Sequence, residues 1–200
     1  MYKLVSADKH SFNTDITDAE ELDEIEKIRK ILNQDEKVLL VARQSRFLPG
    51  GSALTPNNVI ATGRRVIIRD PYMLGLKSEL IDIPYDVVTS VKLQKGIFTS
   101  TILFKAPTLV NKTKLGLIDE NISGEDDQEG IIEALPKDKA EELLEIIRRG
   151  MKPSSDGELM SSVVTISVAD EINKLSKLKQ DGILSESEFQ KMKQQLLEKM

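Results

Sequence analysis

The chain has 200 residues, 40% of them hydrophobic and 30% charged, a composition typical of a folded globular protein rather than a disordered one. It contains no cysteine, which excludes disulfides, thiolate metal sites and cysteine nucleophiles and favours a cytoplasmic location. The net charge of −5 disfavours attraction of the whole molecule to nucleic acid or to an anionic membrane, because both require a positive field.

A polar lead-in, residues 1–16, precedes the first predicted helix, and we expect it to be flexible. It holds no apolar stretch of signal-peptide length, and no apolar run in the chain reaches the roughly 20 residues that span a membrane. Thr17 and Glu20 have the spacing of a capping box, which predicts an amphipathic helix over 17–33. Its apolar positions recur every three or four residues, so it should lie on a larger unit. They are Leu22, Ile25, Ile28, Ile31 and Leu32.

Residues 34–150 have the pattern of an antiparallel β domain, with short β-branched runs bounded by glycine, proline and asparagine. The expected strands are 37–43, 58–62, 64–70, 78–83, 87–93, 99–105 and 131–135. Gly63 suits the tight turn between the second and third runs, because glycine tolerates a positive φ. Pro136 opens a predicted capping helix at 137–149, which should end the domain.

A linker is predicted at 151–165, and a helical hairpin at 166–200. Ser167 caps its first helix, Asp181 and Gly182 break it, and Ser185 with Glu188 forms a capping box for the second. A unit of about 35 residues is too small to bury its own apolar faces well, so we expect it to need a partner surface. Its candidate oligomerisation residues are Ile172, Leu175, Leu178, Ile183, Leu184, Phe189, Met192 and Leu196.

Two segments resemble known families. The runs VIATGRRVIIRDP and IDIPYDVVTSVKLQKGIFTSTILF resemble bacterial and archaeal PH-like domains, and this resemblance covers residues 33–150. It implies an α+β fold in which two packed antiparallel sheets, a sandwich or partly open barrel, are capped by the helix at 137–149.

The run ISVADEINKLSKLKQDGILSESEFQKMKQQLL resembles the SHOCT (short C-terminal) domain and departs from it at Met192, a position that is often lysine. SHOCT units are regarded as oligomerisation elements, and nucleic-acid binding is sometimes suggested for them. Neither family brings a catalytic motif.

Catalytic and metal-binding signals are poor. The single histidine, His10, lies in the lead-in, and no GxSxG, HExxH or Walker motif occurs, so we expect no enzyme activity and no cofactor. Asp119, Asn121 and Ser123 match the first, third and fifth positions of an EF-hand loop, but Gly130 occupies the twelfth, where a bidentate glutamate is needed. We therefore interpret this segment as a solvated acidic loop.

Anion or lipid binding has four candidate residues, because neighbouring strands could gather their guanidinium groups and guanidinium binds phosphate in a bidentate manner. They are Arg43, Arg64, Arg65 and Arg69. The basic first hairpin of inositol-phosphate-binding PH domains is absent at 47–51. The apolar tips at 47–48, 72–74 and 97–98 fit a membrane or partner contact, but we favour packing onto the domain's own core. The lysines of the tail are balanced by acids, which disfavours nucleic acid.

The leading hypothesis is a non-catalytic, cytoplasmic, prokaryotic binding and assembly module. The PH-like domain would serve as a protein-interaction scaffold, and the SHOCT-like hairpin would join subunits into a homo-oligomer. Peripheral binding of a lipid or anionic ligand by the PH-like domain is the alternative, and a nucleic-acid-associated regulator acting through the hairpin is a more remote one.

Overall fold

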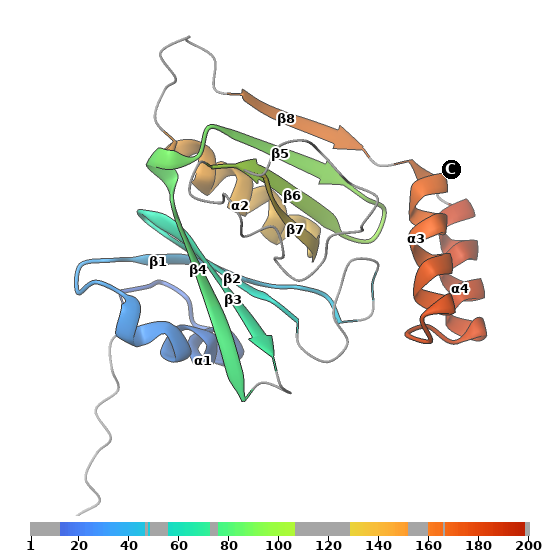
Figure 1. Ribbon diagram of the computed structural model, residues 1–200, viewed down its shortest axis with the longest axis horizontal. Helices are drawn as coiled ribbons and strands as arrows, with labels where there is room; N and C mark the ends of the chain where they lie inside the picture. Colours follow the sequence, from blue (N-terminus) through green and yellow to red (C-terminus); the bar gives the residue numbers. More distant parts are fainter. Residues whose placement is uncertain are drawn as a thin grey trace, which may run out of the picture.

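Two four-stranded sheets pack around one helix in the computed structural model, which describes residues 13–46, 48, 56–72, 76–106, 129–151, 160–165 and 167–198 (Figure 1). The first sheet has the order β1 (Val38–Arg43), β2 (Asn58–Thr62), β3 (Arg65–Tyr72) and β4 (Lys77–Pro84), all antiparallel. The second has the order β7 (Glu129–Leu135), β6 (Ser100–Lys105), β5 (Ser90–Lys95) and β8 (Met160–Thr165). Among the described residues, the two sheets do not join into a closed barrel. The predicted α+β class with packed antiparallel sheets is confirmed.

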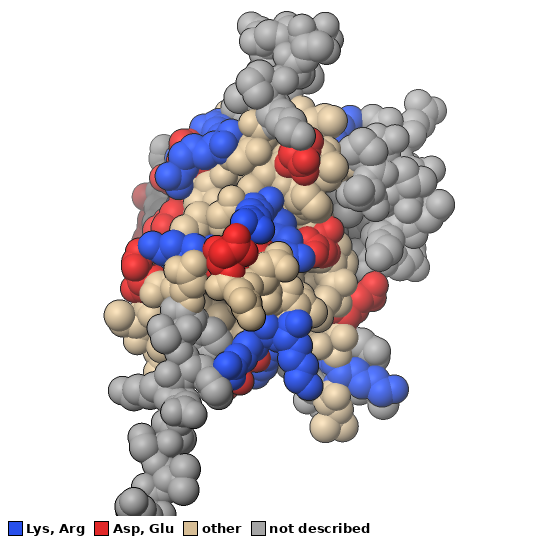
Figure 2. Space-filling view, turned by 90° about the vertical axis from the view of Figure 1, so that its left-hand side faces the viewer, with Lys and Arg blue, Asp and Glu red and all other residues tan. Residues whose placement is uncertain are grey.

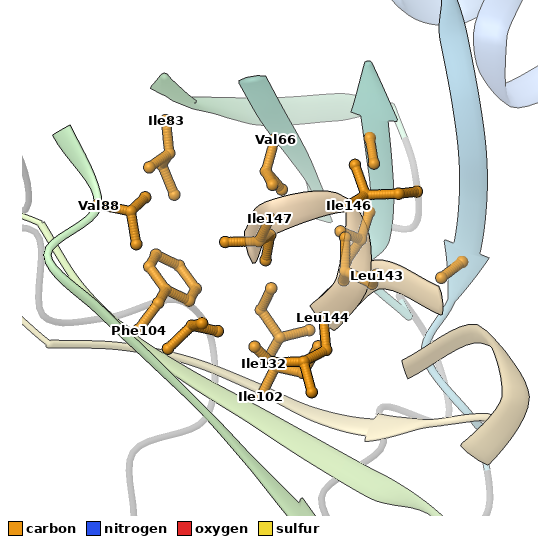
Figure 3. Close-up of a cluster of buried hydrophobic side chains, with 14 of the residues drawn as sticks. Val66, Ile83, Val88, Ile102, Phe104, Ile132, Leu143, Leu144, Ile146 and Ile147 are labelled. Atoms are coloured by element: carbon orange, nitrogen blue, oxygen red, sulfur yellow. The ribbon is translucent and has the colours of Figure 1, made fainter. Parts of the chain in front are cut away.

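Helix α2 (Lys137–Gly150) lies against both sheets and completes the main core. Leu143, Leu144 and Ile147 point into a cluster that receives Val66 from β3 and Phe104 from β6 (Figure 3). These side chains are at most 4% exposed. Because one apolar helix face is shared by two sheets, α2 fixes how the sheets sit relative to each other.

Helix α1 (Ala19–Ile28) covers the outer face of the first sheet and continues as a short 3₁₀ helix, η1 (Arg29–Ile31). Ile25 and Ile28 pack there on Ile60 and Ile67 from the sheet. Both faces of this sheet therefore hold buried apolar side chains, which explains why its central strands, β2 and β3, contain consecutive Val and Ile residues.

The start of α1 differs from the sequence expectation. Asp18, not Thr17, is the N-cap, and its carboxylate accepts the backbone N–H groups of Glu20 and Glu21 at 2.9 and 3.0 Å. An aspartate at the cap satisfies two amides that the helix leaves free and adds a negative charge at the positive end of its dipole. The predicted helix over 17–33 is thus shorter, because Ile28 leaves α-helical geometry and Leu32 is already extended.

Strand β8 lies inside the predicted linker and pairs in parallel with β5, opposite to the antiparallel pairs elsewhere in the two sheets. The strand then leads to α3 (Val168–Gln180) and α4 (Glu186–Leu197), which form the tail hairpin. We use "tail" for β8 and this hairpin together. No helix among the described residues is both long and apolar enough to cross a membrane.

Candidate functional site

The outer face of the first sheet gathers two of the four candidate anion-binding arginines beside α1. Arg65, Ile67 and Arg69 alternate along β3, so their side chains share one face. Ile67 packs under α1, and the two arginines flank it. The face that the sequence offers to an anion is therefore occupied by the protein's own helix.

Arg69 forms an ion pair with Glu24 of α1, and the two side chains are only 10% and 8% exposed. Lys27 donates to the other oxygen of Glu24 at 2.9 Å. The pair lies in the same helix-to-sheet interface as Ile25 and Ile28. Its geometry fastens α1 to β3 and leaves Glu24 fully engaged.

Arg65 is the centre of a larger network. Its Nε and one terminal nitrogen donate to the two oxygens of Glu36, both at 2.7 Å, in the bidentate geometry that suits a guanidinium. The same side chain pairs with Asp82 of β4 and donates to the carbonyl of Ile31 at 2.7 Å. Glu36 also accepts the backbone N–H of Asn33 at 3.1 Å. The network ties the segment after α1 to β3 and β4.

The carboxylate of Glu36 is fully buried, with a side-chain exposure of 0%. Burial opposes its ionisation, but the hydrogen bonds from Arg65 and Asn33 outweigh burial and lower the pKa of Glu36 to about 2. Glu36 is therefore a permanent anion at neutral pH, and Arg65 is its partner.

The other two candidate arginines are exposed and also lie beside carboxylates. Arg64 pairs with Asp35, and Arg43 lies 3.9 Å from Glu20. On the face drawn in Figure 2, basic and acidic side chains are intermixed rather than gathered into a basic patch. An anionic ligand would have to displace protein carboxylates from all four arginines.

The candidate calcium residues Asp119, Asn121 and Ser123 lie outside the described residues, as do Phe47, Met73 and Leu74 of the apolar tips. Among the residues that are described, no group of three or more histidine, aspartate or glutamate side chains has the arrangement of a metal site.

The tail hairpin buries four side chains that the sequence analysis assigned to oligomerisation. They are Leu175, Leu184, Phe189 and Leu196, each at most 7% exposed. The hairpin was expected to need a further surface, and for these four residues the chain's own β5–β6 turn provides one, because Ile97 and Phe98 pack against the cluster. These two apolar tip residues pack on the tail.

Glu171 of α3 connects the hairpin to the β5–β6 turn. Its Oε1 accepts the backbone N–H of Ile97 at 3.0 Å, and the residue is only 5% exposed. Gly96 closes the turn by donating to the carbonyl of Thr99 at 2.9 Å, and a Cβ at Gly96 would overlap the Glu171 carboxylate. Lys174 adds an ion pair to Glu133 of β7 at 3.2 Å. The sequence pattern does not predict this contact, because Glu171 has the position of an ordinary first-turn acid.

Docking of the tail should strengthen as the pH falls. Burial raises the pKa of Glu171, with the Ile97 N–H and the nearby lysines opposing it. A raised pKa means that the docked state binds more protons than the undocked state, so stability declines as the pH rises from the ordinary glutamate pKa through the raised value. Hydrogen exchange of α3 amides across this window measures the effect. Glu171→Gln should remove the pH dependence, whereas an equal dependence in that variant would assign it to another group.

The remaining candidate oligomerisation residues are less covered. Ile172, Leu178 and Met192 are half-buried at the edge of the cluster, and Ile183 is 41% exposed. Three further apolar residues of the tail also reach solvent: Val163 at 49%, Val164 at 42% and Leu197 at 51%.

Comparisons with known proteins divide the chain into the same two parts, the two-sheet domain and the C-terminal hairpin. A family model described as "Bacterial PH domain" matches residues 32–149, and one described as "Short C-terminal domain" matches residues 170–197. An uncharacterized protein of Archaeoglobus fulgidus is 24% identical over 205 residues, which cover 88% of this chain and 96% of the relative.

Two solved structures have lower similarity. A pleckstrin homology domain from Shewanella amazonensis is 14% identical, with a TM-score of 0.43 over 68% of this chain and 91% of that one. A protein with a pleckstrin-homology domain from Shewanella loihica is also 14% identical, with a TM-score of 0.41 over 68% and 98%. At these TM-scores neither structure supports a functional argument.

Proposed function

This chain belongs to the bacterial PH domain family and carries a short C-terminal domain behind it, and on that premise we propose that it is a non-catalytic, cytoplasmic protein-binding module whose tail joins copies of the chain. The two matches confirm both family resemblances. The assembly role is our proposal, and it is supported by where the chain leaves apolar surface.

The observation that carries the proposal is the distribution of exposed large hydrophobic side chains. Of the seven among the described residues, four lie in the tail: Val163, Val164, Ile183 and Leu197. Exposed apolar side chains concentrated in one small part of the chain favour an interaction there, whereas isolated ones need no explanation. A second copy presents the same surface, and isologous pairing of identical patches is the commonest form of assembly.

The PH domain itself is poorly suited to bind a small anionic ligand. One of its cavities lies between α1 and the first sheet and measures about 230 Å³, and four carboxylates line it against two basic side chains. The acids are Asp18, Glu20, Glu21 and Glu24. Such a lining repels phosphate, in agreement with the paired state of the four arginines.

Placing glutamate at three of the exposed tail positions should dissociate the assembly. The variant carries Val164→Glu, Ile183→Glu and Leu197→Glu, and we expect its dissociation constant to rise at least about a hundredfold, because each apolar side chain loses burial and each new charge must be desolvated. Light scattering of the full chain over a concentration series measures this. Circular dichroism should be unchanged, because all three sites face solvent in one subunit.

The matched control places glutamate at Leu76 and Leu80, which are 84% and 37% exposed but lie outside the tail. It should assemble as the wild type does. A wild-type chain that stays monomeric at high concentration would refute assembly through the tail. Flotation of the wild type with anionic vesicles, lost on Arg64→Glu, would favour the lipid-binding alternative instead.

A further inference from the structure

The two sheets have four edge strands, and one differs from the others in charge. Edge strands need protection from pairing with other chains, and charged side chains are the usual means. Arg43 lies in β1, Lys77 and Glu79 in β4, and Glu133 in β7. Strand β8 has the sequence MSSVVT and carries no charge. It is the one edge strand of these two sheets without that protection.

Within the part of the chain that the structure describes, only one side of β8 is paired. All six residues, 160–165, pair with 90–95 of β5, and β8 ends the strand order of its sheet. Figure 1 shows β8 at the rim of the molecule, with no helix or strand drawn outside it. Among the described residues, the outer edge of β8 therefore has no strand partner for its backbone N–H and C=O groups, and it lies beside the exposed side chains of Val163 and Val164.

We propose that β8 pairs with β8 of a second copy, antiparallel about a two-fold axis, and so joins the two second sheets into one continuous sheet. This inference rests on the proposed function and specifies its interface. A strand is the partner that satisfies a row of backbone donors and acceptors, and a two-fold axis across the edge makes the paired strands antiparallel. Self-pairing of β8 brings no like charges together, because it has none.

The pairing makes a specific prediction for the centre of the strand. In an antiparallel pair related by a two-fold axis, one residue of each strand lies directly opposite its own copy, and at the centre of 160–165 this residue is Ser162 or Val163. The pairing places Val163, whose side chain is exposed, in this position, so residue 163 of each copy faces its counterpart across the axis. Side chains in such cross-strand positions have Cβ atoms about 4.5–5.5 Å apart, close enough for charges to repel or attract directly. Residue 163 therefore serves as a charge probe of the interface.

The experiment measures solution mass for four forms of the full chain: wild type, Val163→Lys, Val163→Glu and Val163→Thr. Lysine or glutamate alone should weaken association at least tenfold, because two like charges meet at the axis. An equimolar mixture of the lysine and glutamate variants should associate again, since opposite charges now face each other. Threonine is β-branched and uncharged, so that variant should behave as the wild type.

The outcomes separate this inference from the proposed function. If the wild type associates and Val163→Lys associates equally well, the interface lies elsewhere in the chain and β8 pairing is wrong. If both charged variants are monomeric but their mixture is monomeric too, the substitutions act by disrupting the strand, and the inference is again wrong. A monomeric wild type would instead remove the proposed assembly itself.

Discussion

Replacing Arg65 by methionine should lower the free energy of unfolding by about 3–5 kcal/mol, the usual cost of removing one partner of a buried ion pair. Glu36 would keep its buried position and lose both hydrogen bonds from the guanidinium. Methionine conserves much of the arginine stem, so the loss of stability reflects the missing charge rather than a cavity. Chemical denaturation at neutral pH measures it.

Arg64→Met is the matched control. Arg64 and Asp35 are 56% and 68% exposed, and surface pairs contribute about 0–1 kcal/mol, so the neighbouring substitution should change little. A stable Arg65→Met protein that lost binding to anionic vesicles would contradict this account, because it would show that Arg65 serves a ligand rather than Glu36.

The pH dependence of the wild type adds a second test of the same network. The folded-state pKa of Glu36 is lowered to about 2, so its contribution to stability is present above the ordinary glutamate value of 4.5 and is lost as the pH falls towards 2. Arg65→Met removes the guanidinium that lowers this pKa. The variant should therefore lose less stability than the wild type between pH 4.5 and pH 2.

Truncating Leu175 and Phe189 to alanine should unfold the tail hairpin and leave the two sheets intact. Leu175 is fully buried and Phe189 is 7% exposed, and such truncations cost about 2–5 and 3–5 kcal/mol. An antiparallel pair of short helices has a low free energy of local unfolding. Hydrogen exchange should show α3 and α4 losing protection while β2 and β6 keep theirs.

Leu197→Ala is the control for this prediction, because Leu197 is 51% exposed and its truncation removes little buried area. The hairpin of this variant should stay protected. If the double variant instead kept a protected hairpin, the apolar cluster with Ile97 and Phe98 would not be what holds the tail in place.

Local signals in the sequence predicted most elements of the PH domain. The helix expected at 137–149 is α2 at Lys137–Gly150, and the capping box of Ser185 and Glu188 is present at the start of α4. Both depend on residues within a few positions of each other, where side-chain chemistry acts directly on the backbone. The apolar spacing of Ile25 and Ile28 likewise predicted a helix lying on a larger unit.

Other features depend on contacts between distant segments, which local patterns do not encode. Strand β8 was expected to be linker, because a run of six residues with two serines becomes a strand only when β5 offers its edge. Thr17 and Asp18 are both residue types that cap helices well, and in the folded chain Asp18 is the one that accepts the free backbone N–H groups.

The sequence by itself determined the α+β class, the PH-like body, the C-terminal hairpin and the lack of a recognisable catalytic motif, because these follow from periodicity, turn residues and residue types. Only the tertiary structure decided what the charged and apolar candidates do. It joins Arg69 to Glu24 across 45 positions, Arg65 to Glu36 across 29, and Ile97 to Glu171 across 74. The physical reason is that the role of a charged or apolar side chain depends on the group that it contacts, and folding decides which group that is.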